Sequence, residues 1–385
     1  FSDWQAVKDY HEMGYPVAEV SPDGTFVLTK HEQTGGFISV DTVREQVFYE
    51  MGDPKYYITP DVVADFSTIN LKQQAPDRVS VFGIKGFEPT SQYKVSMAYD
   101  NGYKAVGSII VSGPDAKAKA DRFAEILWHR SQDTFDKKET EYIGWNACHR
   151  SLGLQEDCSE ILLRLGVRSQ DENKVKRFSR LVSSLILSGP PGVSVLGGVP
   201  RVQKIVNYWP ALMAKDLIKP KTLFFQNSQV VDENECSATV IGNSQARTDQ
   251  ETQTADKPTK TIQESLREIN HPEGVLLSLI CLARSGDKGD SVNIGLLARG
   301  EKTYAFIKEY FTAQKIKNLF QELCEGKVTR YSLDGLLGLN FILEKSLGGG
   351  GSCTLRTDAQ GKTFSQALLR QKINIPDSLK DEMLK

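Results

Sequence analysis

The residues between Arg284 and Asn293 form the densest group of chemically capable side chains in the sequence. The group includes two cations, two carboxylates, a hydroxyl and an amide, namely Arg284, Ser285, Asp287, Lys288, Asp290 and Asn293. A lysine flanked by aspartates has its charge held in a fixed place, where it can stabilise an anion or an enolate. One interpretation is a catalytic loop in which Lys288 holds negative charge while Asp287 or Asp290 moves a proton. The alternative is a hairpin closed by salt bridges.

Four consecutive glycines at 348–351 lie inside an otherwise apolar part of the sequence. Ordering a run of glycines costs conformational entropy, so the run needs a structural or functional reason. We expect Gly349 and Gly350 to allow close approach of the backbone to a ligand or to a neighbouring segment such as residues 284–293.

A second glycine-containing loop, Thr34-Gly35-Gly36, directly precedes a predicted helix. Free N–H groups and the positive end of a helix dipole suit a phosphate or a carboxylate. His31 lies just upstream and is a candidate acid or base. The sequence contains neither a G-x-G-x-x-G nor a Walker pattern, so a plain turn and helix cap is the alternative.

Two further pairs of residues have types that can do chemistry. Asp61 and Asp65 could bind a cation or perform acid–base catalysis, although Asp61 after Pro60 also fits a simple cap. Cys148 and His149 are adjacent, and neighbouring side chains in a helix or strand point apart. We therefore do not expect them to act as a pair.

No metal site is predicted from these patterns. The EF-hand spacing is not met at 284–293, because no glutamate closes the loop at the required distance. Metal-assisted hydrolysis using Asp287, Asp290 and Asn293 stays open as a third interpretation of that segment.

The composition excludes several classes of protein. A formal charge of −2 gives no general attraction to nucleic acid or to anionic membranes. The longest apolar stretch, 274–283, is about half of the roughly 20 residues that a transmembrane helix needs. Six cysteines without a C-x-x-C motif argue against structural zinc and against a secreted disulfide framework. We expect an intracellular protein, cytoplasmic or mitochondrial if its source is eukaryotic, that binds neither nucleic acid nor membrane.

The first half of the chain is expected to mix strands and helices. A Pro-Asp-Gly turn predicts a hairpin over 15–31, and an Asp-Asn-Gly turn predicts another over 92–113. Apolar periodicity predicts helices over 39–51, 116–130 and 172–187. A strand at 193–196, a tight loop at 197–198 and a helix from about 201 complete this half.

The second half begins with a polar segment. Residues 231–270 contain few large apolar side chains, so we predict a linker, partly disordered, between two domains at 1–230 and 271–385. In the latter domain we expect strands over 275–283, 292–299, 327–334 and 352–358. A helix is expected over 312–326. This order suggests a sheet covered by helices, an α+β sandwich.

Several long segments resemble the acyclic terpene utilisation protein AtuA family. They are residues 14–66, 188–210, 282–299 and 333–369. The resemblance implies an α/β (α+β) protein, in which a mixed-sheet core domain precedes a small ferredoxin-like domain. Family members carry a glycine-rich stretch upstream of the position of Phe1, so this chain is expected to hold part of the family's core domain.

The resemblance also implies a metabolic setting. It points to the breakdown of acyclic terpenes, whose intermediates are branched acyl-CoA thioesters and whose enzymes include a biotin-dependent acyl-CoA carboxylase. We expect a homo-oligomeric enzyme or enzyme subunit, lyase- or hydratase-like, with a CoA thioester or carboxylate as its small-molecule substrate and no firmly expected cofactor. The alternative is a non-catalytic assembly factor for the carboxylase subunits. A single active site requires residues 31–36, 284–293 and 348–351 to face one cavity.

Overall fold

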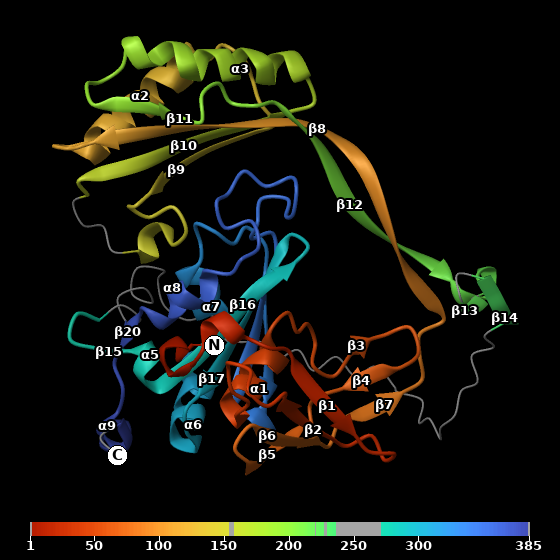
Figure 1. Ribbon diagram of the computed structural model, residues 1–385. Coiled ribbons are helices and arrows are strands. Elements are labelled where there is room, and N and C mark those ends of the chain that lie inside the picture. The colour runs from red at the N-terminus through yellow and green to blue at the C-terminus, as the bar shows by residue number, and fades with distance from the viewer. Residues whose placement is uncertain (1, 154–157, 220, 227–228, 236–270, 384–385) are drawn as a thin grey trace.

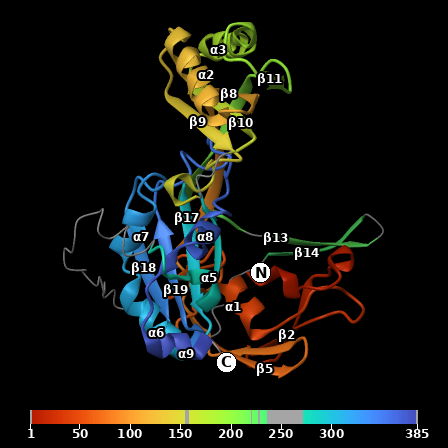
Figure 2. The same cartoon turned by 90° about the vertical axis from the view of Figure 1, so that its left-hand side faces the viewer.

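The computed structural model describes residues 2–153, 158–219, 221–226, 229–235 and 271–383. An upper α/β layer and a lower body of small sheets and helices are joined by a long two-stranded ribbon (Figure 1). The turned view shows the upper layer standing on the lower body, with a loop of the C-terminal part between them (Figure 2). Most of the predicted linker, residues 236–270, lies outside the described residues.

The upper layer is an antiparallel sheet in the order β11-β8-β10-β9 with two helices on one face. Its elements are β8 (Gln92–Ser112), α2 (Ala116–Arg130), β9 (Lys137–Ile143), β10 (Glu160–Ser169), α3 (Glu172–Ser184) and β11 (Val193–Leu196). The predicted apolar face of α2 is confirmed, because Ala120, Phe123 and Leu127 are fully buried. Side chains alternate along a strand, so the sheet's other face, which includes Lys104 and Arg164, points toward the lower body.

The hairpin predicted around residues 100–102 is wrong, because β8 continues through these residues without turning. Gly102 does have a positive φ of 80°. Opposite it, the register of the partner strand shifts between Lys204 and Val206. An Asp-Asn-Gly sequence suits a β-bulge as well as a turn, and here it bends one strand.

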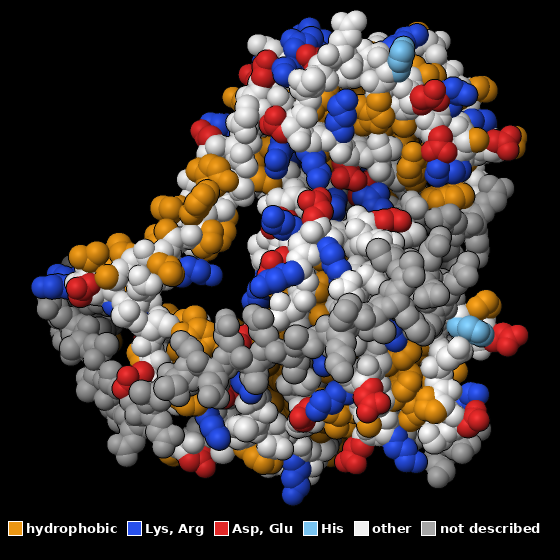
Figure 3. All heavy atoms as spheres, turned by 180° about the vertical axis from the view of Figure 1, so that it is seen from behind, with side chains coloured by type: hydrophobic (Ala, Val, Ile, Leu, Met, Phe, Trp, Pro, Cys, Tyr) orange, Lys and Arg blue, Asp and Glu red, His pale blue; other side chains and the backbone are white. Residues whose placement is uncertain are grey.

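The ribbon is formed by the first half of β8 and by β12 (Gln203–Ala214). The helix predicted from about 201 is therefore wrong. Val, Ile, Tyr and Trp are frequent in this segment and favour a strand. Hydrophobic side chains line the ribbon (Figure 3), including Trp209, which is 57% exposed, and Leu212, which is 67% exposed. The chain then continues into a hairpin of β13 (Lys221–Gln226) and β14 (Gln229–Glu235).

The N-terminal segment contributes two small sheets and one α-helix to the lower body. The first sheet has the order β1 (Pro16–Val20), β2 (Phe26–Lys30), β6 (Arg78–Phe82), β5 (Asn70–Ala75), and its first two strands confirm the hairpin predicted over 15–31. The second contains β3 (Tyr57–Ile58), β4 (Val63–Asp65) and β7 (Lys85–Phe87). Helix α1 (Val40–Phe48) begins at a Ser39 capping box and ends three residues before the predicted Met51.

The C-terminal segment forms a four-stranded antiparallel sheet covered by helices. Its strand order is β16 (Cys281–Lys288), β17 (Ser291–Ala298), β19 (Gly338–Leu343), β18 (Val328–Leu333). The helices are α5 (Leu277–Ile280), α6 (Glu301–Tyr310), α7 (Ala313–Leu319), α8 (Phe364–Leu369) and α9 (Asp377–Met383). A short pair, β15 (Val275–Leu276) and β20 (Lys372–Ile373), lies beside them. Residues 352–358 form turns, bends and irregular backbone and not the predicted strand. Part of the strand predicted over 275–283 is helix α5.

Helix α1 packs directly on the second face of the C-terminal sheet. Phe48 is fully buried there, where a methyl group added to Gly295 or Gly338 would overlap it. The buried Arg44 guanidinium donates to the carbonyls of Leu336 (2.9 Å) and Ala298 (2.8 Å). The N-terminal segment and the C-terminal sheet therefore share one hydrophobic cluster.

Candidate functional site

The charged residues of the 284–293 segment lie on a hairpin and not on a long loop. Arg284, Asp287 and Lys288 belong to β16, Asn293 belongs to β17, and only Gly289 and Asp290 form the turn. Lys288 is exposed at the end of its strand. The segment therefore presents its charges along the edge strand of the C-terminal sheet.

Asp290 binds the four-glycine run. Its Oδ1 accepts hydrogen bonds from the backbone N–H groups of Gly349 (2.7 Å) and Leu347 (3.2 Å). All four glycines at 348–351 have positive φ, and Gly350 packs against the Gly289 carbonyl so tightly that no side chain fits. The expected close approach to the 284–293 segment is thus present, and the anion bound by this turn is the carboxylate of Asp290 itself.

Asp287 and Arg284 surround a tyrosine at the end of α1. Lys362 Nζ donates to the Tyr49 hydroxyl. The same atom lies 3.2 Å from Glu50 Oε1 and 3.9 Å from Asp287 Oδ1. The Arg284 guanidinium lies over the Tyr49 ring at 4.6 Å. Burial raises the pKa of the Glu50 carboxyl, but hydrogen bonds from Tyr49 and Lys362 outweigh this effect and hold the pKa below its usual value. These charges largely compensate one another.

Two fully buried asparagines fix the backbone beside this cluster. Asn293 Oδ1 accepts from the N–H of Glu50 (2.7 Å), and its amide nitrogen donates to Asn340. Asn340 in turn donates to the carbonyls of Met51 (3.0 Å) and Gly52 (2.7 Å). Glu50 has φ of 57°, which is strained for a residue with a side chain. Asn293 therefore supports a backbone conformation in this structure. Ser285 is also buried, and its hydroxyl bonds to Ser365.

The Thr34–Gly36 loop makes its contacts elsewhere. The N–H of Gly35 donates to the Glu12 carbonyl (2.7 Å) and that of Gly36 donates to Lys8 (2.9 Å). The Thr34 hydroxyl donates to the carbonyl of His31 (2.7 Å). This loop is folded against residues 8–14.

The remaining candidate pairs lie on other segments of the chain. Asp65 is buried at the end of β4, where Oδ1 accepts from the N–H of Ser67 (2.8 Å), and Asp61 is exposed. Burial raises the pKa of the Cys148 thiol and lowers the pKa of His149, which disfavours a thiolate–imidazolium pair. Among the described residues, no group of three or more His, Cys, Asp or Glu side chains is placed to hold a metal ion.

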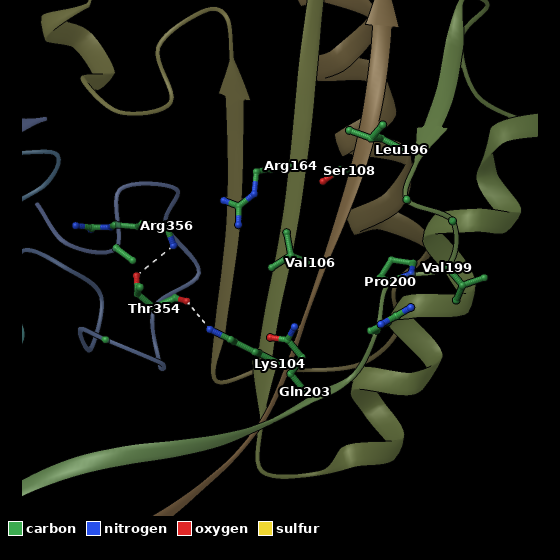
Figure 4. Close-up of a pocket in the computed structure, with 15 residues that line it drawn as sticks. Lys104, Val106, Ser108, Arg164, Leu196, Val199, Pro200, Gln203, Thr354 and Arg356 are labelled. Atoms are coloured by element: carbon green, nitrogen blue, oxygen red, sulfur yellow. Dashed lines mark hydrogen bonds between the residues drawn. The ribbon is translucent and has the colours of Figure 1, made fainter. Parts of the chain in front are cut away.

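A cavity of about 480 Å³ lies between the upper sheet and the C-terminal loop (Figure 4). Its lining comes from three parts of the chain: Lys104, Val106, Ser108 and Arg164 from the sheet; residues 196–201 and Gln203; and Gly351, Thr354, Arg356 and Ala359. Neither residues 31–36 nor residues 284–293 line it, although Gly351 does. The three predicted segments therefore do not face this cavity together.

The lining of the cavity is cationic. It includes Lys104, Arg164, Arg201 and Arg356, and the described residues around it contribute no aspartate or glutamate. The Arg356 guanidinium turns into its own loop and donates to the carbonyls of Leu323 (3.0 Å) and Ser346. Lys104 donates to the carbonyls of Ser352 and Thr354 (3.2 Å), and burial lowers its pKa.

The cavity is held in shape by a buried carboxylate on β9. Glu141, which is 1% exposed, accepts from Arg164 and from the N–H and hydroxyl of Thr357 (3.0 and 2.7 Å). Arg164 also donates to the Leu355 carbonyl (3.1 Å). The upper sheet is thus fastened to the C-terminal loop beside the cavity.

Sequence reasoning missed Lys104, Arg164 and Arg201. The one available signal is a pair of arginines, Arg164 and Arg168, inside the strongly apolar run of β10. They lie an even number of residues apart, so both point to the same face of the sheet, and that face must be polar. Arg201 follows the Gly197–Gly198 loop, whose two positive φ angles confirm the predicted tight loop.

The comparisons with known proteins agree with the fold. Residues 1–224 match the family model of the acyclic terpene utilisation family protein AtuA, and residues 275–374 match the AtuA ferredoxin-like domain. No curated protein and no solved structure matches the chain. The described residues include no helix with the length and apolarity needed to cross a membrane. The predicted mixed α+β architecture with a C-terminal ferredoxin-like domain is confirmed, and the chain belongs to the AtuA family of acyclic terpene utilisation proteins.

Proposed function

We propose that this chain binds an anionic intermediate of acyclic terpene breakdown, an acyl-CoA thioester or a related carboxylate, in the cavity between the upper sheet and the C-terminal loop. The observation that carries the proposal is the cationic lining with no carboxylate among the described lining residues. Family membership supplies the chemical setting of acyclic terpenes. Charge-assisted hydrogen bonds from arginine to a carboxylate or phosphate are about twice as strong as neutral ones.

The reaction we propose is lyase- or hydratase-like. In the hydration direction, the oxygen of water bonds to the β-carbon of an unsaturated acyl group and the proton of that water is released to solvent. The resulting enolate then takes up a proton at its α-carbon, and dehydration runs these steps in reverse. Arg201 would stabilise the negative charge. Lys104 would donate the proton, because its lowered pKa brings it closer to the pH at which a general acid works best.

The experiment that tests this function is a calorimetric titration with a branched carboxylic acid and with its CoA thioester. The variants Lys104→Met and Arg201→Ala should each weaken binding by tenfold or more. Arg177→Ala is the matched control, because Arg177 is an exposed arginine of α3 that pairs with Asp133 (2.6 Å). Equal affinities in all four proteins would refute the cavity as the binding site.

Turnover provides a second, separate readout. Hydration or dehydration of an unsaturated branched acyl substrate should depend on Lys104 more strongly than binding does. Normal turnover by Lys104→Met at saturating substrate would remove the catalytic role and leave the binding role intact.

A further inference from the structure

The two sides of the cavity differ in chemistry, and this difference narrows the class of ligand beyond the proposed function on which it rests. Arg164 and Thr354 lie on one side, whereas Leu196, Val199 and Pro200 lie on the other (Figure 4). Lys104 and Gln203 occupy one end and are paired in register across β8 and β12. The cavity therefore has a charged wall facing a mostly apolar wall, on which Arg201 is the charged residue.

The apolar wall contains side chains that gain from being covered. Leu196 is 49% exposed and Val199 is 58% exposed, although both line the cavity. Val106 continues this surface on β8, two residues from Lys104. Each methylene group that a ligand buries here is worth about 0.8 kcal/mol, which is about a fourfold change in affinity.

The separation of the two walls follows from the register of the sheet. Ser108 of β8 lies opposite Leu196 on one side and opposite Arg164 on the other. Neighbouring strands are about 4.8 Å apart, so the strands carrying the apolar and charged side chains are separated by about 10 Å. Along β8, the four residue steps from Lys104 to Ser108 span about 13 Å.

A CoA thioester of an uncharged acyl chain cannot place a negative charge on the charged wall while its acyl group covers the apolar wall. Its thioester carbonyl is neutral, and its nearest phosphate is removed from the acyl group by the whole pantetheine arm, which is longer than either dimension. A carboxylate attached directly to a branched hydrocarbon chain does fit. Its charge would pair with Arg164, beside Lys104, while its chain covers Leu196 and Val199.

We infer that the ligand carries a carboxylate on its branched chain, and that this carboxylate, not the phosphates of CoA, is what the cavity recognises. Leu196 and Val199 are then the residues that select a branched chain over a short acid. Any CoA moiety attached elsewhere on the chain would extend out of the cavity.

The test is a titration of the full chain with a graded series of ligands. The series comprises 3,7-dimethyloctanoate, the alcohol with the same carbon skeleton, acetate, and CoA itself. We expect the branched acid to bind at least tenfold more tightly than the alcohol, acetate or CoA. Leu196→Ser and Val199→Ser should each weaken the branched acid severalfold and leave acetate unchanged. Both residues are substantially exposed, so these variants should fold normally.

Leu187→Ser is the matched control, because Leu187 is 98% exposed in the short 3-10 helix that follows α3 and does not line the cavity. Equal binding of acetate and the branched acid, or unchanged binding in both wall variants, would overturn the role of the apolar wall. Tight binding of CoA with no binding of the free acid would overturn the recognition of a chain carboxylate while keeping an anion site. Failure of every anion to bind would overturn the proposed function as well.

Discussion

Replacing Glu141 by Ala should open the connection between the upper sheet and the C-terminal loop. The Glu141 side chain is 1% exposed and accepts from Arg164, from the Thr357 N–H at 3.0 Å and from the Thr357 hydroxyl at 2.7 Å. Removing one partner of a buried ion pair costs about 3–5 kcal/mol. Arg164 is 21% exposed and keeps its hydrogen bond to the Leu355 carbonyl. We therefore expect a loss of stability at the lower end of this range, about 3 kcal/mol.

Amide hydrogen exchange of residues 351–359 measures this loss directly. Since about 1.4 kcal/mol corresponds to a factor of ten, exchange at Thr357 should accelerate by about 100-fold in Glu141→Ala. The control is Glu125→Ala, which removes an ion pair with Arg122 whose side chains are 65% and 64% exposed. That variant should leave the exchange rates unchanged. An acceleration below about threefold in Glu141→Ala would refute the view that this carboxylate holds the cavity together.

Three further predictions concern other parts of the molecule. Gly295→Ala should lower the free energy of unfolding by about 1–3 kcal/mol in urea denaturation, because the added methyl overlaps a buried phenyl ring; Gly52→Ala, with open space around its Cβ, should change it little. Asp290→Ala should release two backbone N–H groups and speed hydrogen exchange of the glycine run, corresponding to about 1–3 kcal/mol, whereas Asp290→Asn keeps an acceptor and should lose less. Because burial lowers the pKa of Lys104, anion binding should weaken as the pH rises through a value below 10.5. Lys104→Arg keeps its charge and should abolish this alkaline limb, and a limb that persists in that variant would contradict the assignment.

Local sequence patterns predicted the elements that depend on neighbouring residues. The apolar periodicity of α2, the Ser39 cap of α1 and the turn of the β1–β2 hairpin are all settled within a few residues. The segment at 100–102 shows where such reasoning fails. An Asp-Asn-Gly sequence serves a turn and a bulge equally well, and the choice is made by pairing with β12, about one hundred residues away.

The same limit applies to the candidate site. The 284–293 segment was prominent because its charges are consecutive in sequence, yet the structure uses Asp290 to bind the glycine run and Asn293 to support Glu50. Lys104, Arg164 and Arg201 are separated by dozens of residues and converge only when the upper sheet and the C-terminal loop meet. No spacing rule links residues that are brought together by tertiary contacts alone.

A crystal structure of the protein soaked with 3,7-dimethyloctanoate tests the central claim most directly. We predict density for the carboxylate within hydrogen-bonding distance of Lys104 or Arg164, and density for the branched chain against Leu196 and Val199. Density for the acid at another place in the molecule, with this cavity empty, would contradict the account.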